Sequence, residues 1–511
     1  MLSRRFLPAS LFIALLAVAV PTASAAALPG AHISAAPQDI QKPASYPGIQ
    51  HLHYRYGPIT ISPGQNTIEA HPNTQKPSVP GYITRFKPDL VYAADGTVPP
   101  VDIIHLHHGV WISNYAPLFA AGEEKTIYNF QQGYGLHYQP SDNWIMNYMI
   151  HNLTPVPTKV YITYDVDFVP DTEPAATGIT PIKPQWMDVA GQKWYPVFDV
   201  YKGSGRNGKF TFPDQARGTQ KADIGPNHEW TVPHDVTLIE TGAHVHPGGL
   251  YGDMTVTRGG VTKTIFHSQA KYFEPAGAVS WDVAMTASKP GWKIALKAGD
   301  KVRIHVTYDT RRASWYESMG IMDTFYADGI QPGAIDPFEQ QPDITGQLTH
   351  GHLPENDNHG GDPERSLPDA RRLLSGAPTT KIAIRNYVYG RGDFQLTGKK
   401  GRPPVVRRGR SITFTNYDAT ASISPEQSAY HTITSCKAPC TGATGIAYPL
   451  ANAKIQFDSG ELGYGPNLLG QKFTPAANRD TWRTPKNLPV GTYTYFCRIH
   501  PFMRGSFRVV K

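Results

Sequence analysis

The sequence has little cysteine and little charge, and it lacks long apolar runs. Only three cysteines occur among 511 residues, too few for a disulfide scaffold, for iron–sulfur clusters or for a Cys₄ zinc module in each domain. With 40% hydrophobic and 17% charged residues, the chain has the composition neither of a disordered protein nor of a polytopic membrane protein. Histidine, in contrast, is abundant at 20 residues, so the positions of the histidines carry the functional information.

Residues 1–25 have the three parts of an export signal. Arg4 and Arg5 form the positive start, an apolar run covers 11–20, and Ala23–Ala25 supplies a small-residue cleavage site. The apolar run is too short to cross a bilayer, so we expect no transmembrane segment in the mature chain. We therefore expect a secreted protein, periplasmic or extracellular. Removing the signal lowers the formal charge from +7 to +5, and without a Lys/Arg-rich tract this gives no support for nucleic acid as a partner.

The rest of the chain consists of short β-type runs separated by Gly, Pro, Asn and Asp. Runs such as 160–164 (VYITY) and 302–306 (VRIHV) are typical of antiparallel sandwiches rather than of βαβ units. We predict an all-β chain in which two sandwiches are followed by a polar, Pro/Gly-rich linker and a third β-rich module. The predicted divisions are 46–215 and 216–345 for the sandwiches, 346–378 for the linker and 379–511 for the third module.

The strongest motif lies near the carboxy terminus. The run 492–503 (TYTYFCRIHPFM) places Cys497, His500 and Met503 in a short loop after a strand-like stretch, and His431 ends another such stretch upstream. Two imidazoles, one thiolate and a weak axial thioether are the ligands of a blue-copper electron-transfer site. The sequence therefore predicts a type 1 copper held by these four side chains.

This region resembles the cupredoxins, and its Cys-x-x-His-x-x-Met loop is most similar to that of amicyanin within the plastocyanin-like group. The resemblance implies a Greek-key β-sandwich over 379–511 and electron transfer with a redox partner. The other two cysteines, Cys436 and Cys440, are predicted to form a local disulfide in an oxidising compartment, with a second metal site as the alternative. That pairing would leave Cys497 alone, as a copper thiolate requires.

Three histidines crowd an apolar, strand-like run at 101–111 (VDIIHLHHGVW). Burying three imidazoles without partners is costly, so a metal or a dense hydrogen-bond network is implied. Strand alternation places His105 and His107 on one face and His108 on the other.

A second motif at 241–249 (TGAHVHPGG) places His244 and His246 two residues apart. In a strand this spacing puts both imidazoles on one face, which suits a bidentate clamp for copper or zinc. This motif therefore predicts a second metal-binding group upstream of the cupredoxin-like module.

The region from about 90 to 335 resembles the copper type II, ascorbate-dependent monooxygenases, the family of peptidylglycine α-hydroxylating monooxygenase and dopamine β-monooxygenase. The resemblance implies two jelly-roll-like sandwiches, each with one type 2-like copper. The implied ligands are His107, His108 and His151 for the first copper, and His244, His246 and Met319 for the second. Two alternatives stay open: His105 in place of His108, which strand alternation favours, and Met322 in place of Met319. A bulge in the strand would reconcile the adjacent pair of histidines with strand alternation.

This second resemblance also implies an activity, the hydroxylation of a C–H bond with O₂ at a catalytic group of His244, His246 and Met319. Electrons would come from a reductant or a redox partner protein through the type 1 copper. The substrate, an unknown small molecule or peptide, does not follow from the sequence. The region also lacks the cysteines on which the animal enzymes depend. The alternative is a non-catalytic copper protein for electron transfer or copper handling, and a metal count distinguishes the two, with three coppers per chain against one.

Overall fold

The computed structural model describes residues 39–62, 68–101, 103–153, 156–190, 196–273, 277–278, 281–351, 369–394, 401–420, 429–438, 455–464, 478–500 and 503–511. The predicted export signal at 1–25 and most of the predicted linker lie outside these residues. Within them, no helix has the length and apolar character needed to span a bilayer. The chain is all-β, as predicted, and the helical elements of the described ranges are short 3₁₀ turns: η1 (Pro174–Gly178), η2 (Gly218–Asp223), η3 (Pro226–His228) and η4 (Ala370–Arg372).

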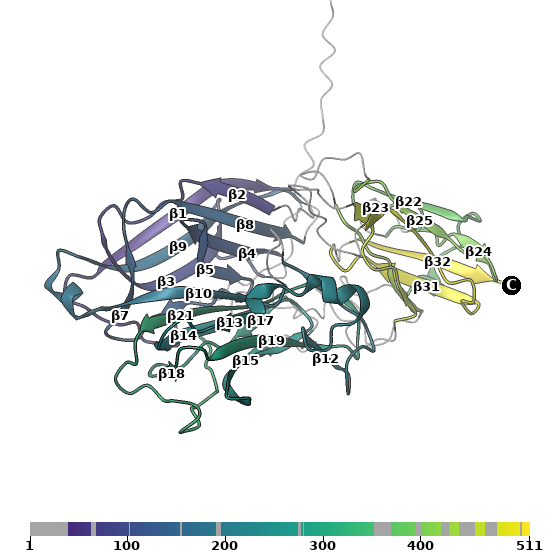
Figure 1. Ribbon diagram of the computed structural model, residues 1–511. Helices are drawn as coiled ribbons and strands as arrows, with labels where there is room; N and C mark the ends of the chain where they lie inside the picture. Colours follow the sequence, from purple (N-terminus) through teal and green to yellow (C-terminus); the bar gives the residue numbers. More distant parts are fainter. Residues whose placement is uncertain are drawn as a thin grey trace, which may run out of the picture.

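A long, twisted sheet runs through the first two thirds of the molecule (Figure 1). Its strands follow the order β1 (Gln50–Ile61), β9 (Thr158–Pro170), β3 (Gly81–Tyr92), β7 (Tyr134–Tyr138), β10 (Thr180–Asp188), β21 (Gly320–Asp328), β14 (Val236–Val245) and β18 (Ile294–Leu296), with β6 (Tyr128–Asn129) paired to β3. In β9 every second residue, such as Val160, Ile162 and Val166, is fully buried. This alternation gives the sheet one apolar face for a second layer.

Two smaller sheets provide further strands of the sandwiches. The first has the order β2 (Ile68–Pro72), β8 (Trp144–Asn152), β4 (Ile104–Ser113) and β5 (Ala116–Gly122). The second has the order β12 (Lys209–Phe212), β19 (Lys301–Asp309), β15 (Gly249–Arg258), β16 (Val261–Tyr272) and β17 (Val283–Met285), with β13 (Glu229–Thr231) paired to β19. A separate ribbon joins β11 (Phe198–Val200) to β20 (Trp315–Ser318).

Each sandwich has an aromatic core. In the first, the rings of Phe86 and Phe119 stack with centroids 4.2 Å apart, and Trp111 lies edge-on to Phe86. In the second, Phe198 and Phe212 stack with centroids 4.0 Å apart. Aromatic side chains bury large apolar areas, so such packing stabilises the two sandwiches without disulfides.

The two sandwiches share the long sheet. Strand β10 pairs antiparallel with β21, and β12 pairs with β19. Strands from before residue 215 therefore complete sheets built from residues after it. The predicted boundary at 215/216 does not coincide with a break between sheets, because pairing between strands distant in sequence is not visible in local composition.

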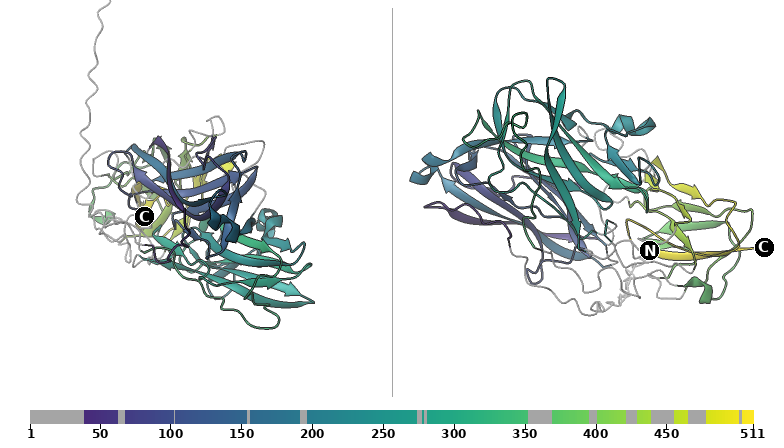
Figure 2. Two further views of the ribbon diagram at one scale, coloured as in Figure 1. Left: turned by 90° about the vertical axis from the view of Figure 1, so that its left-hand side faces the viewer. Right: turned by 90° about the horizontal axis from the view of Figure 1, so that it is seen from below.

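The carboxy-terminal module lies at one end of the molecule (Figure 1 and the right-hand view of Figure 2). One of its sheets has the order β23 (Val388–Tyr389), β22 (Lys381–Arg385), β25 (Thr413–Asn416) and β30 (Thr481–Arg483). The other has the order β24 (Val405–Arg407), β32 (Arg504–Val510), β31 (Gly491–Phe496), β26 (Thr434–Lys437) and β27 (Phe457–Asp458), and a ribbon joins β28 (Gly463–Tyr464) to β29 (Asn478–Arg479). Tyr493, Tyr495 and Phe507 are fully buried in its core.

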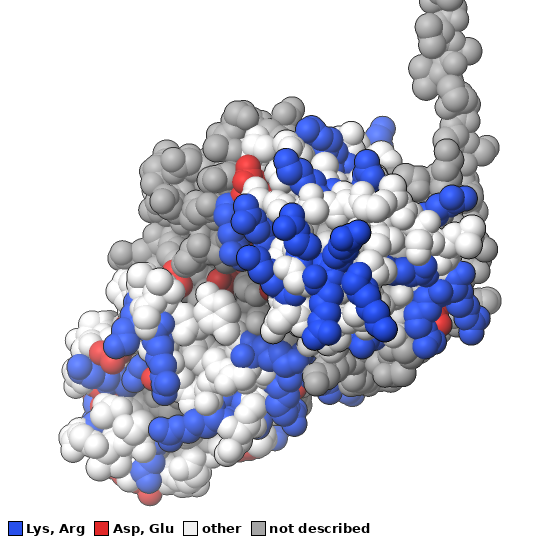
Figure 3. Space-filling view, turned by 90° about the vertical axis from the view of Figure 1, so that its right-hand side faces the viewer, with Lys and Arg blue, Asp and Glu red and all other residues white. Residues whose placement is uncertain are grey.

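Charge is divided unevenly between the modules. Residues 379–511 contain 19 Lys and Arg against 6 Asp and Glu, whereas the rest of the chain contains 29 against 35. Figure 3 shows the basic side chains gathered on the end of the molecule that faces the viewer. The carboxy-terminal module is therefore strongly basic, although the net charge of the whole chain is only +7.

Candidate metal centres

The structure brings His431, Cys497 and His500 together in the carboxy-terminal module. The Cys497 Sγ lies 3.9 Å from His431 Nδ1 and 3.7 Å from His500 Nδ1, and the two Nδ1 atoms are 3.1 Å apart. A single ion about 2.0–2.3 Å from each donor atom would produce separations of this size. All three side chains are fully buried, so the group forms a closed, compact ligand set.

Backbone donors and a carboxylate fix these side chains. The backbone N–H groups of Thr432 and His500 both donate to Cys497 Sγ at 3.3 Å. Asp418 Oδ2 lies 3.0 Å from His431 Nε2, which directs Nδ1 of that ring toward the sulfur. Both contacts are of the kind that orients metal ligands and tunes the ion they hold.

Met503, the predicted axial ligand, is fully buried in the same core cluster as Cys497. Its backbone N–H donates to the carbonyl of His500, and its own carbonyl accepts from the backbone N–H of Cys497. These two backbone hydrogen bonds hold Met503 beside Cys497 and His500.

The charges around Cys497 favour the binding of a cation. Burial raises the pKa of the Cys497 thiol, but the imidazoles of His431 and His500 outweigh burial and hold the pKa well below its usual range. Burial likewise lowers the pKa of His431, yet Asp418 and the Cys497 sulfur raise it to about 9. The thiolate is therefore the stable form of the cysteine, as a soft-metal ligand requires.

The predicted disulfide falls partly outside the described residues. Cys436 is buried on β26, whereas Cys440 lies outside the described residues. The pairing of these two cysteines stays a prediction. Cys497 is the free cysteine of the described part of the chain.

A second group of histidines lies at the ends of β4 and β8. His105 is directly opposite His151 in the antiparallel pair, and the register shifts between Leu106 and His108. His107 is therefore at a bulge, the feature that reconciles the adjacent pair of histidines with strand alternation. The bulge interrupts the alternation of side chains between the two faces of β4. Alternation alone therefore does not determine which of these imidazoles lie close together.

These imidazoles form one continuous cluster rather than two separate groups. Ring centroids are 5.3 Å apart for His105 and His151, 6.1 Å for His107 and His151, and 4.3 Å for His107 and His246. His246 is in turn 4.9 Å from His244. Histidines of both predicted type 2-like ligand sets therefore meet in one place, where β4 and β8 of the first sandwich approach the end of β14.

His105 and His108, the competing candidates for the first set, differ in their surroundings. His105 Nδ1 lies 2.5 Å from the Val101 carbonyl, and its ring lies 4.6 Å from that of Trp281 and close to His151. His108 Nε2 lies 3.0 Å from Asn147 Oδ1. His105 thus lies beside His151, whereas the His107 ring is at similar centroid distances from His105 (6.3 Å) and His108 (5.9 Å), so both alternatives stay open.

The two candidate thioethers lie in different places. Met322 is fully buried, and its methyl group lies beside Gly252 and Ala243 in the core of the second sandwich. Ala243 precedes His244 on β14, so the two side chains leave the strand on opposite faces. Met322 therefore points away from the histidines.

Met319 packs in a small apolar cluster with Met149 and Ile321. Met149, from β8, lines the same cavity as three of the histidines. Nothing in the sequence distinguishes Met149, because a methionine in a β-type run is ordinarily a core residue.

Two buried carboxylates were also not predicted from the sequence. Glu123 and Glu124 directly follow β5 and are 0% and 2% exposed. Glu124 Oε2 lies 2.9 Å from His244 Nδ1. Burial raises the pKa of Glu123, while the pKa of His244 is raised despite its burial because Glu124 faces it. A Glu-Glu-Lys run after a strand is typical of an exposed turn, so only the fold shows that it is internal.

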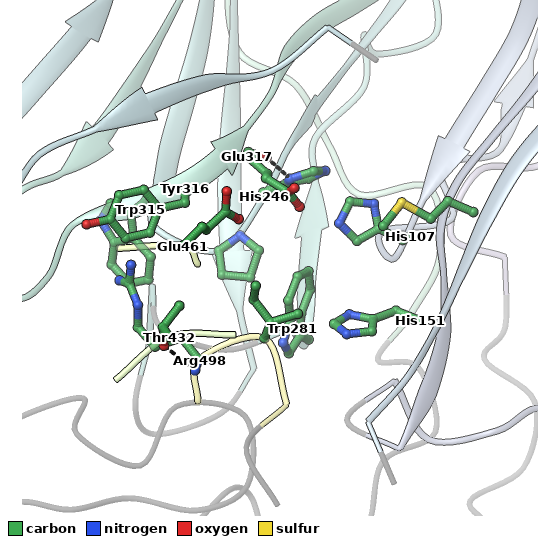
Figure 4. Close-up of a pocket in the computed structure, with 13 residues that line it drawn as sticks. His107, His151, His246, Trp281, Trp315, Tyr316, Glu317, Thr432, Glu461 and Arg498 are labelled. Carbon is green, nitrogen blue, oxygen red and sulfur yellow. Dashed lines mark hydrogen bonds between the residues drawn. The ribbon is translucent and has the colours of Figure 1, made fainter. Parts of the chain in front are cut away.

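A cavity lies where the three modules meet (Figure 4). His107, His151 and His246 line one side, and Trp315 and Arg498 belong to the other. It offers about 70 Å³ to water-sized molecules, which is room for a few of them. The cavity therefore places the histidine cluster next to space for small molecules at the module junction.

The carboxy-terminal module is attached to this junction next to its own ligand loop. Arg498 follows Cys497 directly, and its guanidinium lies 4.5 Å from the ring centroid of Tyr316 and donates to the Ser314 carbonyl. His500 lies near His151, with ring centroids 6.1 Å apart. One imidazole of the Cys497 group therefore contacts the histidine cluster of the sandwiches.

No protein-family model and no curated protein matches the chain. Among solved structures, a purple cupredoxin from Nitrosopumilus maritimus is 20% identical, with 26% of this chain and all of that chain covered at a TM-score of 0.16. The Cu(I) form of a mutant amicyanin is 19% identical, with 29% and 95% covered at 0.15. A Cu-containing nitrite reductase from Thermus scotoductus SA-01 is 14% identical, with 55% and 58% covered at 0.16.

Proposed function

We propose that the chain is a copper-dependent oxidoreductase in which the Cys497 group exchanges electrons with a metal centre in the histidine cluster. The observation that carries this proposal is the contact between His151 and His500. The donor sets fit copper, since a buried thiolate with two imidazoles suits a type 1 site and an imidazole cluster suits a type 2-like site. Bound copper would supply one-electron redox chemistry at both places.

The chain's own residues contribute burial and rigidity. His431 and His500 are fully buried, and Asp418 holds the His431 ring from outside the donor group. A ligand group held in this way rearranges little when its charge changes. The short separation between His500 and His151 provides a path between the modules that does not cross solvent.

We further propose that the reaction is an O₂-dependent hydroxylation of a small molecule. The balance is R–H plus O₂ plus two electrons and two protons, giving R–OH and water. An external reductant or redox partner supplies the two electrons one at a time at the carboxy-terminal module. The order of the histidine motifs supports this chemistry, and the size of the cavity favours a small substrate over a peptide.

The proposed arrangement differs in one respect from the resemblance to the ascorbate-dependent monooxygenases, which implies one copper on each sandwich. Here His107 and His246, from the two predicted sets, are 4.3 Å apart between ring centroids. The proposal therefore treats the cluster as one reaction centre at the module junction. We propose that the protein works outside the cytoplasm, in keeping with the predicted export signal.

The proposal is tested by O₂ consumption of the copper-loaded, full-length protein with excess reductant. The wild type should consume O₂, and Cys497→Ser should reduce the rate at least tenfold while keeping the metal of the histidine cluster. The matched control is Ser411→Ala, a change at a half-buried residue elsewhere in the same module, where the hydroxyl donates only to the Thr484 carbonyl. A wild type that cycles its blue absorption but consumes no O₂, with or without added small molecules, would instead be an electron carrier.

A further inference from the structure

One corner of the histidine cluster contains a carboxylate. A carboxylate oxygen of Glu123 and ring nitrogens of His244 and His246 all lie within 4.8 Å of one another. The three residues are 0%, 7% and 3% exposed. They come from two elements, the end of β5 and the end of β14, which the fold brings side by side.

Both imidazoles are already oriented by contacts at Nδ1. His244 Nδ1 lies 2.9 Å from Glu124 Oε2, and His246 Nδ1 lies 2.6 Å from the backbone carbonyl of Glu317. Glu317 adopts a left-handed backbone conformation, with φ of 54°, a costly geometry for a non-glycine residue. Metal-binding histidines characteristically make such a contact with the ring nitrogen that does not bind the ion.

The atoms that remain are buried without hydrogen-bond partners. In the described part of the chain, His244 Nε2, His246 Nε2 and both carboxylate oxygens of Glu123 have none. Leaving such buried groups unsatisfied is costly, and here several converge. A bound cation would satisfy them together.

The local sequence makes this approach possible. A Cβ on Gly122 would lie 2.4 Å from His244 Cε1, so only glycine lets the ring pack against the end of β5. The following loop is then held in place, because Gly122 N–H donates to Glu124 Oε1 at 2.9 Å and His350 Nε2 lies 2.6 Å from the Glu124 carbonyl. Glu123 is thus fixed facing the two imidazoles.

We propose that Glu123, His244 and His246 form a two-histidine, one-carboxylate site for a first-row divalent transition metal. This ligand set replaces the set of His244, His246 and Met319. Met319 packs among apolar side chains instead. A carboxylate is a harder ligand than a thioether, so the site favours Cu(II), Fe(II) or Zn(II) over Cu(I). The proposal deepens the proposed function by naming ligands of its second centre, yet metal binding here does not require electron transfer.

The test is the metal content of the full-length protein. Chelator-stripped protein is loaded separately with Cu(II), Zn(II) and, without oxygen, Fe(II), then desalted and measured by mass spectrometry. Glu123→Gln should lose one ion per chain or bind it at least tenfold more weakly, whereas Met319→Leu should keep it. The blue absorption of the Cys497 group, present in both variants after copper loading, shows that each has folded.

Glu339→Gln, an exposed change of the same chemistry, is the matched control and should keep all its metal. In addition, the type 2-like Cu(II) electron paramagnetic resonance spectrum should change in Glu123→Gln and not in Met319→Leu. Unchanged metal content and spectrum in Glu123→Gln, or a loss in Met319→Leu alone, would overturn the carboxylate site. Metal at this site together with a lack of O₂ consumption would overturn the proposed function and leave this inference standing.

Discussion

His151 and His500 meet edge to face, with ring centroids 6.1 Å apart. His151 lies on β8 of the first sandwich, and His500 lies in the loop before β32 of the carboxy-terminal module. Because His500 also belongs to the group with Cys497 and His431, this single contact joins the two regions that the sequence marks as metal-binding.

Asp418 should control the affinity of the carboxy-terminal site. Replacing it by Asn removes the negative charge 3.0 Å from His431 Nε2 while keeping the shape of the side chain. Loss of such an outer contact typically weakens metal binding by about 10–100-fold. We expect Asp418→Asn to do so in copper titrations followed by the blue absorption. Equal affinities for the variant and the wild type would show that Asp418 does not position the ligand.

Gly122→Ala should disturb the histidine cluster through packing alone. The added methyl group would lie 2.4 Å from His244 Cε1, so the ring must shift. We expect a loss of about 1–3 kcal/mol of unfolding free energy and weaker metal binding at Glu123, without any change in the blue absorption. Denaturant unfolding and metal analysis measure the two effects, and Gly178→Ala, with open space around it and no positive φ, controls for the loss of glycine itself. A fully loaded Gly122→Ala protein would contradict the close packing.

Asp323 should make the protein less stable as the pH rises. Burial raises its pKa to about 8, against the lowering effect of the neighbouring Tyr128 hydroxyl. Between the unfolded value near 4 and about 8, the folded state retains a proton that the unfolded state has released, so stability falls across this range. Asp323→Asn cannot ionise, so we expect it to be about 1–3 kcal/mol more stable than the wild type at pH 8 and similar at pH 4.

Denaturant unfolding of wild type and Asp323→Asn at both pH values measures this difference. Asp343→Asn is the control, because that carboxylate is exposed and its pKa is lowered rather than raised, first by Lys289. A constant difference between wild type and Asp323→Asn across the range would refute the assignment.

The basic carboxy-terminal module should favour anionic reductants. The module has 19 basic and 6 acidic residues. Its net positive charge attracts an anion and repels a cation, and salt screens both effects. We expect the rate of reduction of the Cys497 site by an anionic complex to fall several-fold between ionic strengths of about 0.01 and 0.5 M. The rate with a cationic complex should rise. Stopped-flow absorbance measures both, and parallel responses would show that this charge does not guide the encounter.

The sequence was most informative where ligands lie close together along the chain. Cys497, His500 and Met503 fall within one loop, and their chemical types indicate the metal without any knowledge of the fold. The all-β class likewise followed from local alternation, as in the run at 160–164, because alternation reflects burial directly.

The sequence was least informative where contacts depend on packing between distant elements. The position of His107 at a bulge depends on the register between β4 and β8. The burial of Glu123 depends on Gly122 meeting His244. The sharing of one sheet by both sandwiches depends on the pairing of β10 with β21. The burial of Glu123 and the shared sheet leave no local signature in composition or spacing, and the adjacency of His107 and His108 indicates a bulge without giving the register.

Electron transfer within one copper-loaded molecule tests the coupling of the two centres most directly. A brief pulse of a one-electron reductant should bleach the blue absorption of the Cys497 site. The absorption should then recover in a first-order step whose rate does not depend on protein concentration, as the electron reaches the histidine cluster. His151→Phe, which keeps an aromatic ring between the modules and leaves the blue spectrum intact, should slow this recovery at least tenfold. A wild type that does not recover, or a variant that recovers at the same rate, would contradict the coupling of the two centres through His151 and His500.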